Sequence, residues 1–263
     1  MRLGALTLLV VLMATASLVL VRSPWNYSTQ DRQQIGAGSS PGHWSGTDEL
    51  GRDRSTRVAA ASIIGLAGAI AASALATCIA VSVGVTAAFA PRGIAAGLLY
   101  FSDLFLALPW LFLLMMVRSA LPLSLAPAQS AVVTFLLLAL LGWPAYARLA
   151  YARTFALLNS TWMIQGRASG LRTKQLARRH VLPHLRPLVL SQFLICIPAC
   201  IVAEANLGTL GLGVSEPLPS WGSMLLALEH SAVLASSGWV YFPIVLLVVI
   251  LIVLEMLVFE VYQ

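Results

Sequence analysis

The sequence predicts an all-α membrane protein with six transmembrane helices. Of its 263 residues, 59% are hydrophobic and only 10% are charged, whereas a soluble domain carries about 25% charged residues. The surface of one soluble core would need more polar residues than the chain has, which excludes an ordinary soluble enzyme and a disordered protein. The apolar residues also fall into six runs, each long enough to cross a bilayer as a helix of about 20 residues.

The first apolar run, 3–21, precedes a polar segment at 22–57 that is rich in Gly, Ser, Asp and Arg. A cleaved signal peptide is the alternative for this run, because Ala14-Thr15-Ala16 resembles a cleavage site. The apolar residues continue beyond these alanines. We therefore interpret 1–57 as a first transmembrane helix with an outer polar segment, and 58–263 as a core of five helices.

The spans of this core are predicted at 58–90, 94–121, 128–147, 188–207 and 239–259. In the first of them, mostly small side chains recur at helical spacing in two adjacent rows: Ala61, Gly65, Ala69, Ser73 and Thr77, and Ala60, Ile64, Gly68, Ala72, Ala76, Ala80 and Gly84. Small residues let helices approach closely in lipid, where no hydrophobic effect drives their association. We expect 58–90 to lie inside the bundle; the alternative is merely an alanine-rich composition.

The placement of charge orients the chain. Eight of the 16 Lys and Arg residues lie between 148 and 186, and no Asp or Glu occurs from 104 to 203. Basic loops stay in the cytoplasm, so we expect this segment to be cytoplasmic and, with six spans, both termini as well. The segments 22–57 and 208–237 then face outward. Basic residues gathered in one loop of an apolar chain do not indicate nucleic-acid binding.

Within this basic region, 158–187 is predicted to form a structured elbow, because two short helical patterns flank Gly170. Glycine permits a sharp turn, and Pro183 is expected to end the second helix before the next span begins. The alternative is a loop whose basic residues only contact lipid phosphates.

The elbow resembles the cytoplasmic EAA loop in the permease subunits of bacterial ABC importers, through the spacing of Gly170 and Leu182-Pro183 and through Arg167-Ala168. Ile164-Gln165-Gly166 stands where that family has Glu-Ala-Ala. Five further blocks are similar, in order, to the C-type permeases of dipeptide, oligopeptide and nickel importers: 46–53 (GTDELGRD), 107–110 (ALPW), 143–148 (WPAYAR), 210–214 (LGLGV) and 219–225 (PSWGSML). The polar tail that this group carries after its last span is absent.

The resemblance implies the fold of a type I ABC importer permease with a cytoplasmic coupling helix, moving peptides across the cytoplasmic membrane by alternating access. It implies a homologous B-type permease, two ATPase subunits and an extracytoplasmic binding protein as partners. The residues that it assigns to ATPase coupling are Arg167, Ala168, Ser169, Gly170, Leu171, Arg172, Leu182 and Pro183.

The sequence has no G-x-x-x-x-G-K-[ST] phosphate loop. We therefore expect ATP and Mg²⁺ to be bound by the ATPase partners, and this chain to be no enzyme and to bind no cofactor or metal. Two other functions stay open at this point. One is a nickel or metal-chelate importer of the same group; the other is a stand-alone secondary transporter driven by an ion gradient, which would show two inverted halves.

Asp103 and Glu204 are candidates for the translocation path, because ionisable residues inside spans are costly and face protein or a wet cavity. Asp103 lies about 14 Å into its span at 1.5 Å per residue. The structural alternatives are a salt bridge to a helix of the partner permease for Asp103, and support of the following loop for Glu204.

Other residue patterns predict structure rather than chemistry. A local salt-bridged turn is expected in the outer segment, from Asp48, Arg52 and Asp53. Cys196 and Cys200 share a helix face and are expected to pack against neighbouring helices rather than bind a metal. Trp221 and Trp239 are expected to anchor the chain at the membrane interface.

Overall fold

The computed structural model describes residues 2–262, apart from 123–124, 169, 171–172 and 232–240. The described residues form helices joined by short connections and one irregular polar segment at 23–53, with no strand beyond two isolated bridges. The helices are α1 (Arg2–Arg22), α2 (Arg54–Phe89), α3 (Arg92–Ala107), α4 (Trp110–Ser119), α5 (Pro127–Gly142), α6 (Pro144–Leu158), α7 (Thr161–Ala168), α8 (Thr173–Leu176), the π-helix η1 (Ala177–Val181), α9 (Leu182–Thr209), α10 (Trp221–Ser231) and α11 (Phe242–Tyr262). The predicted all-α fold is confirmed.

Five stretches of the described chain are long and apolar enough to cross a membrane: Gly4–Arg22, Arg54–Phe89, Pro127–Leu158, Arg179–Thr209 and Phe242–Phe259. The consecutive helices α3 and α4 make a sixth span if they are taken together. Five of the six predicted spans are thus matched by continuous apolar stretches, and the sixth by this bent pair.

The third span, predicted at 94–121, is not one continuous helix but a bent pair of helices. Helices α3 and α4 meet at an angle of 88°. Leu108 takes an extended conformation (φ −93°, ψ 137°) directly before Pro109. Proline disfavours the helical conformation of the residue that precedes it, so the helix ends at Ala107 and a new one begins at Trp110.

The basic region is more helical than predicted. Pro144 does not end the fourth span, because it occupies the first turn of α6, where a missing N–H costs no hydrogen bond. The chain from 148 to 158, predicted to lie in the loop, is helical. Pro183 likewise lies in the first turn of α9 rather than ending the preceding helix. Helix α9 thus starts at Leu182, directly after η1, the apolar stretch that contains it begins at Arg179, and the non-spanning elbow is shorter than 158–187.

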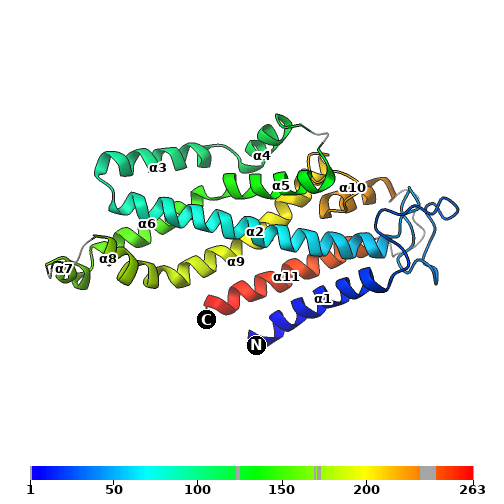
Figure 1. Ribbon diagram of the computed structural model, residues 1–263, viewed down its shortest axis with the longest axis horizontal. Coiled ribbons are helices and arrows are strands. Elements are labelled where there is room, and N and C mark those ends of the chain that lie inside the picture. Colours follow the sequence, from blue (N-terminus) through cyan, green and yellow to red (C-terminus); the bar gives the residue numbers. More distant parts are fainter. Residues whose placement is uncertain (1, 123–124, 169, 171–172, 232–240, 263) are drawn as a thin grey trace.

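Helix α2 is the centre of the bundle, as its small residues predicted. It contacts α1, α3, α5, α6, α9 and α10 (Figure 1). All five residues of the row from Ala61 to Thr77 are buried, as are Ala60, Ala72, Ala76, Ala80 and Gly84 of the other row. A Cβ atom on Gly84 would lie 2.6 Å from the carbonyl oxygen of Ala147 and 2.7 Å from the amide nitrogen of Tyr151.

Replacing Gly84 with alanine is expected to lower the free energy of unfolding by about 2 kcal/mol, because the added methyl group meets the backbone of α6, which cannot rotate away. Gly97→Ala on α3 is the matched control, since nothing lies within 4 Å of a Cβ atom there. Thermal unfolding of the two purified variants in detergent measures the difference. Equal midpoints for Gly84→Ala and the wild type would contradict the close contact of α2 with α6.

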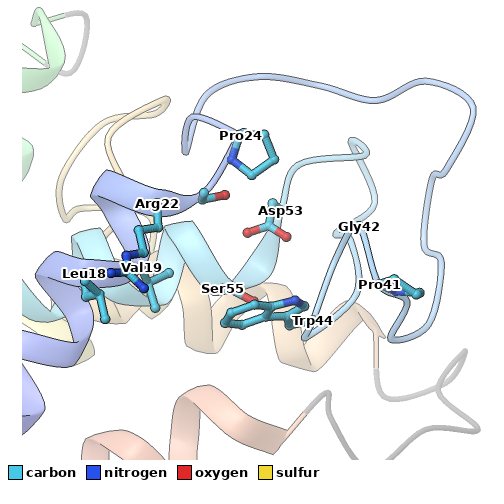
Figure 2. Close-up of a pocket in the computed structure, with 10 residues that line it drawn as sticks. Leu18, Val19, Arg22, Pro24, Pro41, Gly42, Trp44, Asp53 and Ser55 are labelled. Carbon is cyan, nitrogen blue, oxygen red and sulfur yellow. The ribbon is translucent and has the colours of Figure 1, made fainter.

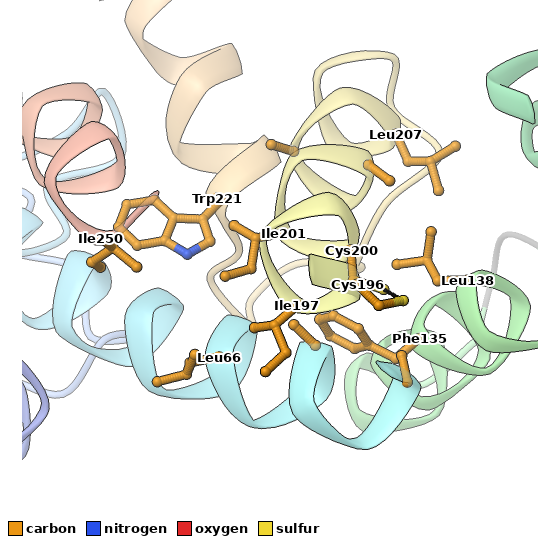
Figure 3. Close-up of a cluster of buried hydrophobic side chains, with 14 of the residues drawn as sticks. Leu66, Phe135, Leu138, Cys196, Ile197, Cys200, Ile201, Leu207, Trp221 and Ile250 are labelled. Atoms are coloured by element: carbon orange, nitrogen blue, oxygen red, sulfur yellow. Dashed lines mark hydrogen bonds between the residues drawn. The ribbon is translucent and has the colours of Figure 1, made fainter. Parts of the chain in front are cut away.

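The apolar core lies where α2, α5, α9, α10 and α11 meet (Figure 3). Trp221 of α10 is buried there, 1% exposed, with Ile197 and Ile201 of α9 in the same cluster and its indole ring against Gly65 of α2. The prediction that Trp221 anchors the chain at the membrane interface is wrong, because the ring fills the space above a glycine of α2. Trp239 lies outside the described residues.

Candidate functional site

The elbow occupies the end of the bundle farthest from the polar segment 23–53 (Figure 1). It is held by a small apolar cluster separate from the main core, formed by Leu158, Met163, Leu176, Val181 and Leu185. Phe89 and its neighbours at the end of α2 pack against this cluster. A displacement of the elbow would therefore be transmitted to α2 and α9, because their ends share one packed cluster.

Three of the residues assigned to coupling, Arg167, Ala168 and Gly170, lie at the turn between α7 and α8. Arg167 and Ala168 end α7, and Gly170 lies in the turn with φ +77° and, among the described residues, no atom within 4 Å of a Cβ position. Leu182 and Pro183 lie in the first turn of α9, where Leu182 is 43% exposed. Ser169, Leu171 and Arg172 lie outside the described residues.

One further residue of α7 bears on docking and was missed in the sequence. The side chain of Ile164 is 56% exposed, while Met163 beside it is fully buried in the cluster that holds the elbow. An exposed isoleucine on a short surface helix offers an apolar contact to a partner. Sequence spacing alone could not assign the two neighbours to opposite faces, because α7 has only eight residues.

Asp103 forms a salt bridge inside the chain. Its Oδ1 atom accepts a hydrogen bond of 2.8 Å from Nε of Arg148 on α6, and its Oδ2 atom accepts a second one from Nη2. The side chains of Arg148 and Asp103 are 37% and 43% exposed. The pairing expected for Asp103 was with the partner permease; the structure instead gives it a partner on α6 of the same chain, because α3 and α6 pack against each other.

Glu204 is 1% exposed and lies one and a half turns before the end of α9. Its carboxyl group faces the hydroxyl of Ser220 and the backbone N–H groups of Trp221 and Gly222 at the start of α10, yet forms no hydrogen bond of normal geometry with any described residue. Glu204 lines none of the cavities that we describe, so its position agrees with the structural alternative, support of the α9–α10 connection.

Four charged residues join two distant segments at the end of the molecule opposite the elbow. We call Asp48, Arg52, Arg57 and Glu216 the polar clamp. Nε of Arg52 donates to Asp48 at 2.7 Å and its Nη1 to Glu216 at 2.6 Å, while Nη2 of Arg57 donates to Glu216 at 2.8 Å. The turn predicted from Asp48 and Arg52 is confirmed. Arg57 and Glu216 were missed, because 159 residues separate them.

Asp53, expected in the same turn, serves helix α2 instead of the polar clamp. Its Oδ2 atom accepts from the backbone N–H of Thr56 at 2.8 Å, which caps the helix, and its Oδ1 atom lies 3.0 Å from Nδ1 of His43. A crevice of about 410 Å³ lies beside it, between the end of α1 and the polar segment, with Trp44 on its wall (Figure 2). Asp53 lines this crevice, and each of its two carboxylate oxygens already has one hydrogen-bond partner there.

Cys196 and Cys200 share a face of α9 as predicted, with their sulfur atoms 3.8 Å apart in the buried core (Figure 3). Ser73 of α2 donates to the sulfur of Cys200 at 3.8 Å. Within the described part of the chain, no group of three His, Cys, Asp or Glu side chains is placed to hold a metal ion.

Comparison with known proteins identifies a family and several relatives that this chain resembles. The sequence profile of the family described as binding-protein-dependent transport system inner membrane component matches residues 80–262. The oligopeptide transport system permease protein OppC of Bacillus subtilis is 28% identical over 219 residues, 83% of this chain and 70% of the relative. The glutathione transport system permease protein GsiD of Pectobacterium atrosepticum is 30% identical over 210 residues, 80% of this chain and 67% of the relative. The dipeptide transport system permease protein DppC of Bacillus subtilis is 27% identical over 223 residues, which is 84% of this chain and 67% of the relative.

Proposed function

The chain belongs to the family of binding-protein-dependent transport system inner membrane components, and from this premise we propose that it is the C-type permease subunit of an ABC importer that brings short peptides into the cell. The family match carries the proposal, because it runs from α2 through the elbow to α11. The named relatives serve oligopeptides, glutathione and dipeptides, which favours peptides as the cargo. Membership in this family decides against the stand-alone ion-coupled transporter.

ATP hydrolysis is assigned to partner ATPases, which would bind the nucleotide and Mg²⁺. The elbow would couple ATP hydrolysis to transport by binding the open and the closed ATPases with different affinity. A partner shifts a conformational equilibrium only by its difference in affinity for the two states. Exposed Ile164 and the turn at Gly170 form the proposed docking surface. The buried cluster around Met163 supports rigid-body transmission to α2 and α9.

The proposed orientation puts the elbow and both termini in the cytoplasm and the polar segment 23–53 outside. The concentration of Lys and Arg around the elbow supports it. In Figure 1 the two chain ends lie close together, at the ends of α1 and α11 that are farther from the polar segment. The outer binding protein and the B-type permease are proposed as the other partners.

The salt bridge between Asp103 and Arg148 is proposed to face the translocation path. Both charged side chains are more than a third exposed within spanning helices. Charged groups at this depth do not face hydrocarbon, but line a wet cavity or meet another protein. Helices α3 and α6 would therefore border the path or the partner permease, rather than lipid.

Separate replacement of Asp103 by asparagine and Arg148 by glutamine is expected to lower peptide uptake strongly, because each leaves an unpaired charge in the span. The exchange Asp103→Arg with Arg148→Asp is expected to recover much of the loss by restoring the bridge. Uptake of a labelled dipeptide by cells expressing equal amounts of each variant measures this. An exchange variant no better than the single variants would speak against a pairing role.

Purification of this chain from native membranes tests the proposed function itself. We expect one homologous permease and two ATPase subunits to co-purify in a stable complex. A chain that is isolated alone, under conditions that preserve known ABC importers, would refute the assignment.

A further inference from the structure

Arg118, in the last turn of α4, is a buried cation without a counter-charge. It is 1% exposed, and among the described residues no carboxylate lies within 4.0 Å of its guanidinium group. Nη2 donates to the hydroxyl of Ser130 at 3.1 Å, and Nη1 makes a long contact of 3.3 Å with the carbonyl oxygen of Pro122. Its Nε atom has no hydrogen-bond partner among the residues that the structure describes. A buried charge without an opposite charge is strongly unfavourable, so an anion that reaches it gains the missing interaction.

A cavity of about 430 Å³ borders Arg118 at the end of the molecule that carries the polar clamp. Its walls come from the polar segment around Glu49 and Arg52, from the connection at 211–216 and from α10. The volume falls within the range of about 300–1,000 Å³ found for small-molecule sites. The cavity therefore has room for a ligand of a few residues, and the proposed orientation opens it toward the side from which the peptide comes.

The charges around this cavity are unevenly satisfied. Arg52 and Glu216 are paired with each other and with further members of the polar clamp. Two lining residues are left without an ion pair within the described residues: buried Arg118 and exposed Glu49. Glu49 interacts with Arg54 only through its charge, without a direct ion pair. One cation and one anion without a direct ion pair, on the wall of a single cavity, match a ligand that carries both signs of charge.

The position of the guanidinium group is fixed by a network rather than by a single contact. The hydroxyl of Ser130 accepts from Arg118, donates to the carbonyl oxygen of Gly213 at 3.3 Å and accepts from the backbone N–H of Ser215 at 3.1 Å. Arg118 is thereby tied to the same connection that walls the cavity. A guanidinium group held in this way is suited to a carboxylate, which it binds through two parallel hydrogen bonds.

We propose that this cavity is an outer subsite for peptides with free termini, in which Arg118 binds the carboxylate and Glu49 binds the ammonium group. The inference rests on the proposed function, because it names the chemical form of peptide that the permease accepts after delivery. A carboxylate would replace the weak contact of Arg118 with Pro122. Peptides that are amidated at the C-terminus, or acetylated at the N-terminus, would lose one of the two interactions.

The test compares uptake of glycylleucine with uptake of its C-terminal amide, by the complete complex in proteoliposomes. The ratio of the two rates is measured for the wild type and for Arg118→Gln. Any preference of the binding protein is the same in both and cancels between them. Loss of a charged hydrogen bond predicts that the ratio falls by about tenfold or more in Arg118→Gln. Arg118→Lys, which keeps the charge, should lie between the two, and the exposed Arg32→Gln should keep the wild-type ratio.

A ratio in Arg118→Gln within about twofold of the wild type would overturn the subsite. If Arg118→Gln does not accumulate in the membrane, the exposed Glu49→Gln is tested in its place. Uptake of glycylleucine is then compared with uptake of N-acetylglycylleucine. A fall of about tenfold in this ratio supports the subsite, and a ratio within about twofold of the wild type overturns it. A wild-type complex that takes up no peptide would instead refute the proposed function. Equilibrium binding of glycylleucine to the complex in nanodiscs then decides the subsite: tenfold weaker binding to Arg118→Gln supports it, and equal or no binding overturns it.

Discussion

Replacing Gly170 with valine is expected to abolish ATP-driven uptake while the chain still inserts into the membrane. Gly170 has φ +77°, and no atom of the described part of the chain lies within 4 Å of a Cβ atom placed on it. The cost of a β-branched residue is therefore conformational, about 1–3 kcal/mol, and falls on the turn between α7 and α8. The turn would change shape without disturbing the packed helices. Uptake and retention of the ATPases during purification are the two measurements.

Gly170→Asn is the matched control, because asparagine tolerates positive φ far better than valine does. We expect it to retain most of the uptake. If Gly170→Val takes up peptide as fast as the wild type does, this turn has no coupling role. If the variant is lost from the membrane, the substitution has caused a folding defect instead.

Replacing Glu216 with leucine is expected to lower the free energy of unfolding by about 3 kcal/mol, the low end of the range for breaking a buried ion pair, because Glu216 itself is half exposed. Two buried guanidinium groups, Arg52 and Arg57, would be left to share Asp48. The thermal midpoint in detergent should fall by about 5 °C or more. Arg32→Gln, an exposed residue of the same segment, should change it by little, and an unchanged midpoint in Glu216→Leu would show that the polar clamp does not stabilise the fold.

The number of spans and the central place of α2 could be predicted from the sequence because both depend on local patterns. Runs of apolar residues set the spans, and the row from Ala61 to Thr77 is readable from its helical spacing alone. The match with the EAA loop likewise depended on the short spacing from Gly170 to Pro183. Such features are fixed by neighbours in the chain, and the structure retains them.

The consequences of proline were harder to predict, because they depend on position within a turn. Pro109 follows an extended residue and bends the span by 88°. Pro144 and Pro183 lie in first turns, where the helix needs no N–H group, and interrupt nothing. The same residue type therefore produced one sharp bend and two continuous spans.

Charged pairs across the fold could not be predicted at all. Asp103 and Arg148 are 45 residues apart, and Arg52 and Glu216 are 164 apart. Their meeting depends on how α3 packs on α6 and on how the 211–216 connection folds back over the polar segment. The isolation of Arg118 is a property of the assembled structure, since it is defined by carboxylates that lie elsewhere.

Uptake of glycylleucine into proteoliposomes tests the central claim most directly, with the binding protein outside and nucleotide inside. The complex of this chain, its partner permease and the two ATPases should accumulate the dipeptide with ATP and not with a non-hydrolysable analogue, and omission of this chain should abolish accumulation. Uptake that continues with the analogue, or that this chain sustains alone on an ion gradient, would contradict the account.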